Sequence, residues 1–165
     1  MNTKNLTIIG LLTALSIVIP FAVFFKVIIP PFSATISSHV PMFVAMFFGP
    51  KAAIMVGLGS GLGFFLTLGP LVGARALMHI IVGMIGARML KNGYSFGIVA
   101  LVTAPIHGLL EVMVIMPFVD FNAYNLFIIT GVGTMLHHGV DAFIAKVIVN
   151  ILEKPKLINM SHLKS

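Results

Sequence analysis

Long apolar runs, each about the length of a membrane-spanning helix, follow one another along nearly the whole chain. A helix that crosses a bilayer needs about 20 mostly apolar residues. Charged residues make up only 8% of the chain, whereas a soluble domain carries about 25%. The chain therefore cannot cover a water-facing surface. This excludes a soluble globular enzyme and predicts an all-α membrane protein.

Turn residues divide the chain into six helices, which form a compact bundle and a single transmembrane domain over residues 1–165. Gly49-Pro50, Gly69-Pro70 and Lys91-Asn92-Gly93 are the clearest turns. The predicted helices are Leu6–Phe25, His39–Phe48, Lys51–Leu68, Leu71–Leu90, Tyr94–Met116 and Tyr124–Glu153, with an irregular stretch from Lys26 to Ser38. The second helix, at about ten residues, is short for a span. Five spans with a re-entrant piece are the alternative.

Basic residues fall mostly on one side of this predicted bundle and account for the formal net charge of +6. Lysine and arginine accumulate in cytoplasmic loops. This rule favours cytoplasmic N- and C-termini and an even number of spans, and it leaves no need for a nucleic-acid partner. With six spans, the inner side receives Lys4, Lys51, Arg88, Lys91, Lys154, Lys156 and Lys164, and the outer side receives Lys26.

Several ionisable residues lie inside the predicted spans, where they are costly and are candidates for function. Arg75 and His79 are four residues apart, as are His107 and Glu111, so each pair shares one helix face. Together with the polar residues near the outer ends of the helices, they predict a small-molecule pocket that opens outward. The candidate substrate-binding residues are Arg75, His79, Glu111, His39, Ser37, Asn125, Tyr124 and Lys26.

Arg75 has two interpretations, and they can coexist. Its guanidinium offers a two-pronged donor to a carboxylate ligand. It can also pair with Glu111 and join two helices. His107 is interpreted as an interhelical hydrogen-bonding residue. For the remaining cluster, predicted in the middle to inner half of the last helix, we expect helix packing or an inner-side contact: His137, His138 and Asp141.

The sequence predicts no catalytic residue, no metal site and no cofactor. It lacks a His-Glu-x-x-His pattern and a phosphate-binding loop. Ser60 has no base near it in the sequence, and the glycines around it indicate close helix packing. These features favour a capture subunit that draws energy from partner proteins. An intramembrane enzyme that uses the His, Glu and Asp residues, and a stand-alone carrier, remain alternatives.

Gly10 and Ala14, four residues apart, give the first helix a small-residue face that allows close helix approach. With the chain length, the six predicted spans, the short second helix and the basic ends, this motif resembles the substrate-binding S component of energy-coupling factor (ECF) vitamin transporters. In that family an Ala-x-x-x-Ala motif docks on the transmembrane coupling subunit. The resemblance therefore implies that Gly10 and Ala14 form the partner-docking face.

Two stretches, Ser33–Pro41 and Arg75–His79, are similar to the niacin-type S components. The resemblance implies a high-affinity vitamin-capture subunit of an ECF-type importer in the plasma membrane of a prokaryote. Niacin is the first candidate ligand, and pantothenate or pyridoxine is the alternative. It also implies a coupling subunit and two ATPase subunits as partners, with ATP hydrolysis confined to those subunits. The S component would topple in the lipid bilayer, and the Pro30-Pro31 loop would be the lid over the pocket.

Overall fold

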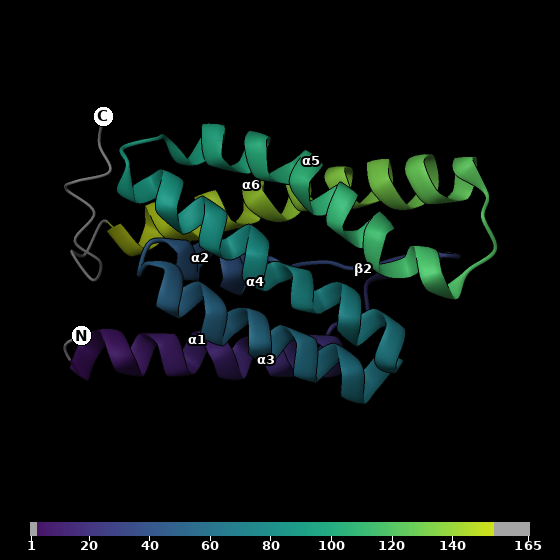
Figure 1. Cartoon of the computed structure of the whole chain (residues 1–165). Helices are drawn as coiled ribbons and strands as arrows, with labels where there is room; N and C mark the ends of the chain where they lie inside the picture. Colours follow the sequence, from purple (N-terminus) through teal and green to yellow (C-terminus); the bar gives the residue numbers. More distant parts are fainter. Residues whose placement is uncertain (1–2, 154–165) are drawn as a thin grey trace.

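The structure is a computed structural model that describes residues 3–153. Within this part of the chain, five helical segments are long and apolar enough to cross a membrane. They lie side by side in one bundle (Figure 1). The fold is therefore the predicted all-helical membrane bundle. The five segments are α1 (Thr3–Ala22), α3 (Pro50–Leu68), α4 (Pro70–Lys91), α5 (Phe96–Ile115) with the 3-10 helix η1 (Met116–Phe118), and the π-helix η2 (Tyr124–Val132) with α6 (Gly133–Glu153).

The second predicted helix is shorter than expected. α2 (Val40–Met46) has seven residues, which at 1.5 Å per residue is about 10 Å. It cannot cross a bilayer, so six spanning helices are not confirmed. The start of α1 and the end of α6 still lie at the same end of the bundle (Figure 1). Five crossings alone would leave them at opposite ends, so the segment from Val23 to Met46 returns the chain by other means.

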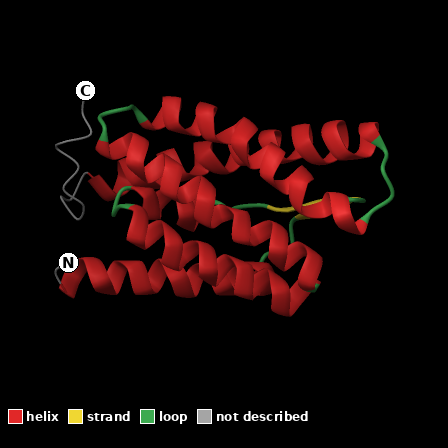
Figure 2. Cartoon of the chain, in the orientation of Figure 1, coloured by secondary structure: helices red, strands yellow, loops and turns green. Residues whose placement is uncertain are grey.

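This return segment opens with a β-hairpin, where the sequence predicted an irregular stretch. β1 (Lys26–Ile29) pairs antiparallel with β2 (Phe32–Thr35), with Lys26 opposite Thr35 and Ile29 opposite Phe32. The Pro30-Pro31 peptide bond in the turn is cis. The two strands, yellow in Figure 2, differ in burial: Phe32 and Thr35 of β2 are buried, whereas Val27, Ile28 and Ile29 of β1 are exposed. The second strand brings the hydroxyl and carbonyl groups of Ser33 against Arg75 of α4.

Glycines hold α3 close to two neighbours on alternate sides. A Cβ added to Gly59 or Gly63 would collide with α1, and one added to Gly57 or Gly61 would collide with α4. Small residues let membrane helices approach this closely. The packing interpretation of this glycine-rich stretch is therefore confirmed.

The apolar core surrounds α2, whose seven residues are all buried. Phe43 and Met42 at its centre pack with buried side chains of α3, α4, α5 and α6. The polar groups described below lie around the beginning of this helix. The core therefore fixes α2, and with it His39, which directly precedes α2.

Candidate functional site

Arg75 and Glu111 form an ion pair between α4 and α5. Nε and Nη2 of Arg75 both donate to Oε2 of Glu111, at 3.0 and 2.6 Å. Thr134 of α6 donates to the same oxygen at 2.7 Å. Both charged side chains are buried. The pairing that the sequence allowed is therefore present, and it links three helices.

The β-hairpin covers the other side of the Arg75 guanidinium. Nη1 donates to the Ser33 hydroxyl at 3.1 Å and to the Pro31 carbonyl at 3.3 Å, and Nη2 donates to the Ser33 carbonyl at 3.1 Å. These three acceptors are neutral, and all belong to the hairpin. A carboxylate that took their place would gain a charge-assisted hydrogen bond. Arg75 thus contacts the Glu111 carboxylate on one side and, on the other, neutral hairpin groups that a ligand could replace.

Asp141 of α6 ties the segment after the hairpin to the bundle. Its carboxylate accepts from the backbone N–H of Ser37 at 2.7 Å and from the N–H of His39 at 2.9 Å. It also lies 2.9 Å from Nδ1 of His39. Ser37 has a φ of 68°, in the left-handed region that side chains other than glycine rarely adopt. The carboxylate therefore fixes both this turn and the tautomer of His39, with the proton on Nδ1.

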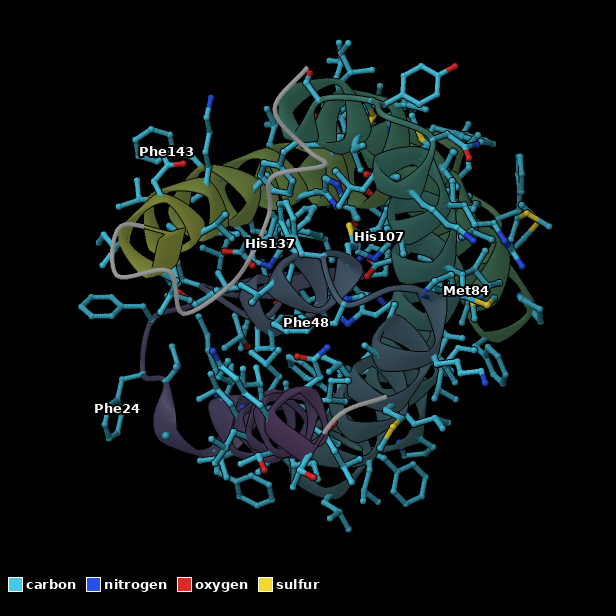
Figure 3. All side chains as sticks on the ribbon, turned by 90° about the vertical axis from the view of Figure 1, so that its left-hand side faces the viewer. Phe24, Phe48, Met84, His107, His137 and Phe143 are labelled. Atoms are coloured by element: carbon cyan, nitrogen blue, oxygen red, sulfur yellow. The ribbon has the colours of Figure 1, made fainter. Side chains whose placement is uncertain are left out.

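Four imidazoles gather around that of His39 and make a cluster of five. Its ring centroid lies between 4.5 and 5.6 Å from those of the other four. Viewed from the end that holds the termini, His107 and His137 point into the bundle, whereas Phe24 and Phe143 point outward (Figure 3). The five come from the turn before α2 and from three long helices. They are His39, His79, His107, His137 and His138.

Most of these rings have a hydroxyl partner. Ser60 of α3 lies 2.8 Å from Nδ1 of His79, which supplies the partner that the sequence did not reveal for this serine. Ser38 lies 3.1 Å from Nε2 of His137, and Thr103 lies 3.0 Å from Nε2 of His138. Within residues 3–153, the only fully buried side-chain nitrogen or oxygen without a hydrogen-bond partner is Nε2 of His107.

A small cavity of about 30 Å³ lies between the hairpin, α4 and this cluster. A water molecule needs roughly 10–15 Å³ measured in this way, so the cavity is smaller than a pyridine ring requires. Its polar lining contains both groups of the ion pair and three of the imidazoles. The lining residues with charged or imidazole groups are Arg75, Glu111, His39, His79 and His137.

A larger hollow of about 670 Å³ lies on the other face of the hairpin, against η2 and α6. Its walls are mostly aliphatic, with Lys26 and His137 as the ionisable side chains. Ala34 and His137 line both hollows. The larger hollow has more room but lacks the guanidinium, so the smaller cavity is the better site for an anion.

The other predicted substrate-binding residues lie outside the small cavity. Ser37 contributes its backbone N–H to Asp141, as described above. Lys26 donates from Nζ to the Pro20 carbonyl at 3.0 Å and lines the larger hollow. At the start of η2, Tyr124 is exposed and Asn125 is half-buried.

His137, His138 and Asp141, for which we expected helix packing or an inner-side contact, pack inside the bundle. They lie beside His39 because the return segment brings α2 back to their level. No spacing in the sequence gives that contact, which joins residues 102 positions apart. The roles of Thr134 and Thr103 were also missed, since a threonine in an apolar helix carries no signal of its own. Gly10 and Ala14 are exposed on α1, as a docking face requires.

The comparisons with known proteins support one relationship. The chain is 34% identical to the niacin transporter NiaX of Lactococcus lactis subsp. cremoris (strain MG1363), over 93% of this chain and 76% of the relative. No family model matches the chain, and no solved structure matches it. The similarity extends over nearly all of the chain.

Proposed function

Because the chain belongs to the family of niacin-type S components of ECF transporters, we propose that it captures nicotinate from outside the cell, with Arg75 as the partner of the ligand carboxylate. The single observation that carries this proposal is the buried guanidinium at the cavity wall. Few groups bind a planar carboxylate better, because guanidinium donates two parallel hydrogen bonds. The positive charge explains why an acid would be preferred over its amide.

The hairpin acts as the lid in this proposal. The cavity is too small for the vitamin while Ser33 and Pro31 occupy the guanidinium. Outward movement of the hairpin frees Nη1 and part of Nη2 for the ligand carboxylate. Glu111 keeps Nε of Arg75 and the Thr134 hydroxyl as partners. Closure over the ligand then excludes water from the site.

His79 is the residue that we assign to the ring nitrogen of nicotinate. It lies one helical turn from Arg75 and lines the same cavity. The Cβ atoms of residues four apart on a helix lie about 5–6 Å from each other, so the two side chains can reach different ends of one small aromatic acid. Because Ser60 occupies Nδ1 of His79, Nε2 remains for the ligand. His39 and His137 complete the wall around the ring.

We propose that transport requires partner subunits and that this chain binds them through α1. Gly10 and Ala14 are exposed, and a Cβ at Gly10 meets nothing within 4 Å. A helix of a membrane coupling subunit can approach such a face closely. Two ATPase subunits would supply the energy, so this chain itself hydrolyses nothing. The protein would lie in the plasma membrane of a prokaryote, where it topples to deliver the vitamin.

The orientation that we propose puts both termini in the cytoplasm. Lys4 at the start of α1, Lys51 at the start of α3, and Arg88 and Lys91 at the end of α4 all lie toward the end of the bundle that holds the termini (Figure 1). Basic residues concentrate on the cytoplasmic side. The hairpin turn and the cavity then face outward.

A ligand survey by isothermal titration calorimetry tests the proposal. The purified protein would be titrated with nicotinate, nicotinamide, pantothenate and pyridoxine. We expect tight binding of nicotinate and at least about tenfold weaker binding of nicotinamide, since the charged partner of Arg75 is lost. Preference for nicotinamide would rule out the role of Arg75. Preference for pantothenate or pyridoxine would support vitamin capture but reject nicotinate as the ligand.

A further inference from the structure

Three buried imidazoles from separate parts of the chain meet below the cavity, and we infer that His39, His107 and His138 bind a divalent transition-metal ion. Each offers a ring nitrogen, and these nitrogens all lie within 4.8 Å of one another. All three residues are at most 2% exposed. They come from the turn before α2, from α5 and from α6. No metal site was predicted from the sequence, because no spacing motif links these positions.

The three rings also have the outer contacts of metal-binding histidines. Such a histidine usually donates its second N–H to a carboxylate, carbonyl or other acceptor, which orients the ring. Nδ1 of His39 lies 2.9 Å from Oδ2 of Asp141. Nε2 of His138 lies 3.0 Å from the Thr103 hydroxyl, which donates its own proton to the Val99 carbonyl at 2.7 Å.

His107 has the same arrangement, with a longer contact. Its Nε2 lies 3.6 Å from Oε1 of Glu111. The nitrogens that remain for an ion are Nε2 of His39, Nδ1 of His107 and Nδ1 of His138. Nδ1 of His107 and Nδ1 of His138 are 3.3 Å apart. Two nitrogen ligands at about 2.05 Å from one tetrahedral zinc ion lie about 3.4 Å apart, so this pair already has the spacing of two metal ligands.

Without an ion, the proton positions in the cluster conflict. A neutral imidazole carries one N–H. If Nδ1 of His107 carries the proton and donates to His138, then Nε2 of His107 has none. That Nε2 presents a lone pair to the Glu111 carboxylate, which is repulsive. If Nδ1 of His138 carries the proton instead, then Nε2 of His138 must accept the Thr103 hydroxyl proton. The hydrogen bond from Thr103 to the Val99 carbonyl is then lost. An ion that accepts both Nδ1 lone pairs removes the conflict, because each Nε2 can then carry a proton toward its acceptor.

Neutral imidazole ligands favour zinc, nickel, cobalt or copper over magnesium or calcium. Three protein ligands leave the fourth tetrahedral position open, and His39 also lines the cavity. A divalent ion would bring the buried set of Arg75, Glu111 and Asp141 to one net positive charge. A monoanionic ligand would balance that charge. This last step rests on the proposed function, whereas the metal site itself does not.

Cobalt binding to the full-length protein tests the site. The protein would carry a purification tag without histidines, be stripped with EDTA, and be titrated with Co²⁺ in nanodiscs without any vitamin. We expect one Co²⁺ per chain with the strong visible absorption of tetrahedral cobalt. His107→Gln and His138→Gln should weaken binding more than tenfold. His162→Gln, which removes a histidine beyond the described residues 3–153, is the control and should bind as the wild type does.

Thr103→Val keeps the shape of the side chain and removes only the hydroxyl acceptor of His138. It therefore tests the site even where the histidine variants fail to fold. We expect roughly 10–100-fold weaker Co²⁺ binding for Thr103→Val, with unchanged thermal unfolding of the metal-free protein. No Co²⁺ binding to the wild type, or binding that the His107, His138 and Thr103 variants all leave unchanged, would overturn the inference. Cobalt binding by a protein that binds no nicotinate would keep the metal site and reject the proposed ligand.

Discussion

The bundle joins its helices in two different ways. On one side, α1, α3 and α4 approach through glycines, with Gly59 and Gly63 against α1 and Gly57 and Gly61 against α4. On the other side, α4, α5, α6 and the hairpin meet through buried polar groups around Arg75. These contacts permit little rearrangement, because the backbones come close at Gly57 and Gly63. Polar contacts can exchange one partner for another. The first side therefore suits a rigid support, and the second suits reversible ligand capture.

This contrast also separates the two proposed interactions in space. α1 packs mainly against α3 and leaves its other face, with Gly10 and Ala14, exposed. The cavity lies beyond α3, between the hairpin and α4. A partner on α1 and a vitamin in the cavity would not compete for the same surface. Variants on one side should therefore leave the function of the other side intact.

The largest effect should come from filling a glycine contact on the rigid side. Gly63→Leu would push a side chain into the backbone of α1 near Ile17, and overpacking of this kind costs about 1–3 kcal/mol or more. Gly10→Leu is the matched control, since its new Cβ meets nothing within 4 Å and leucine favours the helix over glycine. Thermal unfolding in detergent would measure both. Equal unfolding temperatures would mean that α1 and α3 can separate easily.

The next largest effect should be the loss of vitamin binding on the polar side. Arg75→Ala removes the proposed carboxylate partner, and we expect nicotinate affinity to fall at least about 100-fold. Because it also leaves Glu111 buried and unpaired, the double variant Arg75→Ala with Glu111→Ala serves as its control. Calorimetry should show weak binding in both. Normal affinity in the double variant would mean that the ion pair only joins the helices.

Asp141→Asn should have a smaller effect, confined to the hairpin and the turn after it. The amide keeps the shape of the side chain but loses the charge that accepts from Ser37 and His39. Hydrogen bonds to a charged group contribute roughly 1.5–3 kcal/mol. We expect faster hydrogen exchange in residues 26–40 and unchanged exchange in α1. Uniformly faster exchange would instead indicate a general loss of stability.

The smallest effect on the isolated protein should come from the exposed face of α1. Gly10→Trp or Ala14→Trp should leave stability and nicotinate binding unchanged, because neither residue is packed inside the bundle. Vitamin uptake by cells should nevertheless be lost, since a bulky ring blocks close helix approach. Leu101→Trp, at another exposed helix position, is the matched control and should transport normally. Normal uptake by the α1 variants would place the docking face elsewhere.

Local sequence signals predicted the helices well where the chain turns sharply. Gly49-Pro50 and Gly69-Pro70 mark the starts of α3 and α4, and Pro50 and Pro70 are the first helical residues. Proline favours this position because its missing N–H would have no partner there. The hairpin was not predicted, because its short strands carry no clear alternation and its turn resembles an irregular loop. The length of α2 was overestimated by three residues, because the apolar run continues to Phe48 while the helix ends at Met46.

The candidate site was predictable only where its residues share one helix. The four-residue spacing put Arg75 with His79, and His107 with Glu111, on common faces, and the structure brings both pairs to the same cluster. The contact of His39 with Asp141 depends on how the return segment folds back. The π-helical turns of η2 further shift the level of α6, because more residues fill each turn. Such contacts arise from the tertiary fold alone.

The β-hairpin has one more consequence, for the depth of the protein in the bilayer. Among the described residues, β1 pairs only with β2, so the other edge of β1 presents backbone N–H and C=O groups without strand partners. Hydrocarbon does not tolerate an open strand edge. The lipid tails therefore cannot contact that edge, so β1 lies above the hydrocarbon or against a protein surface. Any tilt that carried β1 toward the tails would require another protein surface to cover that edge.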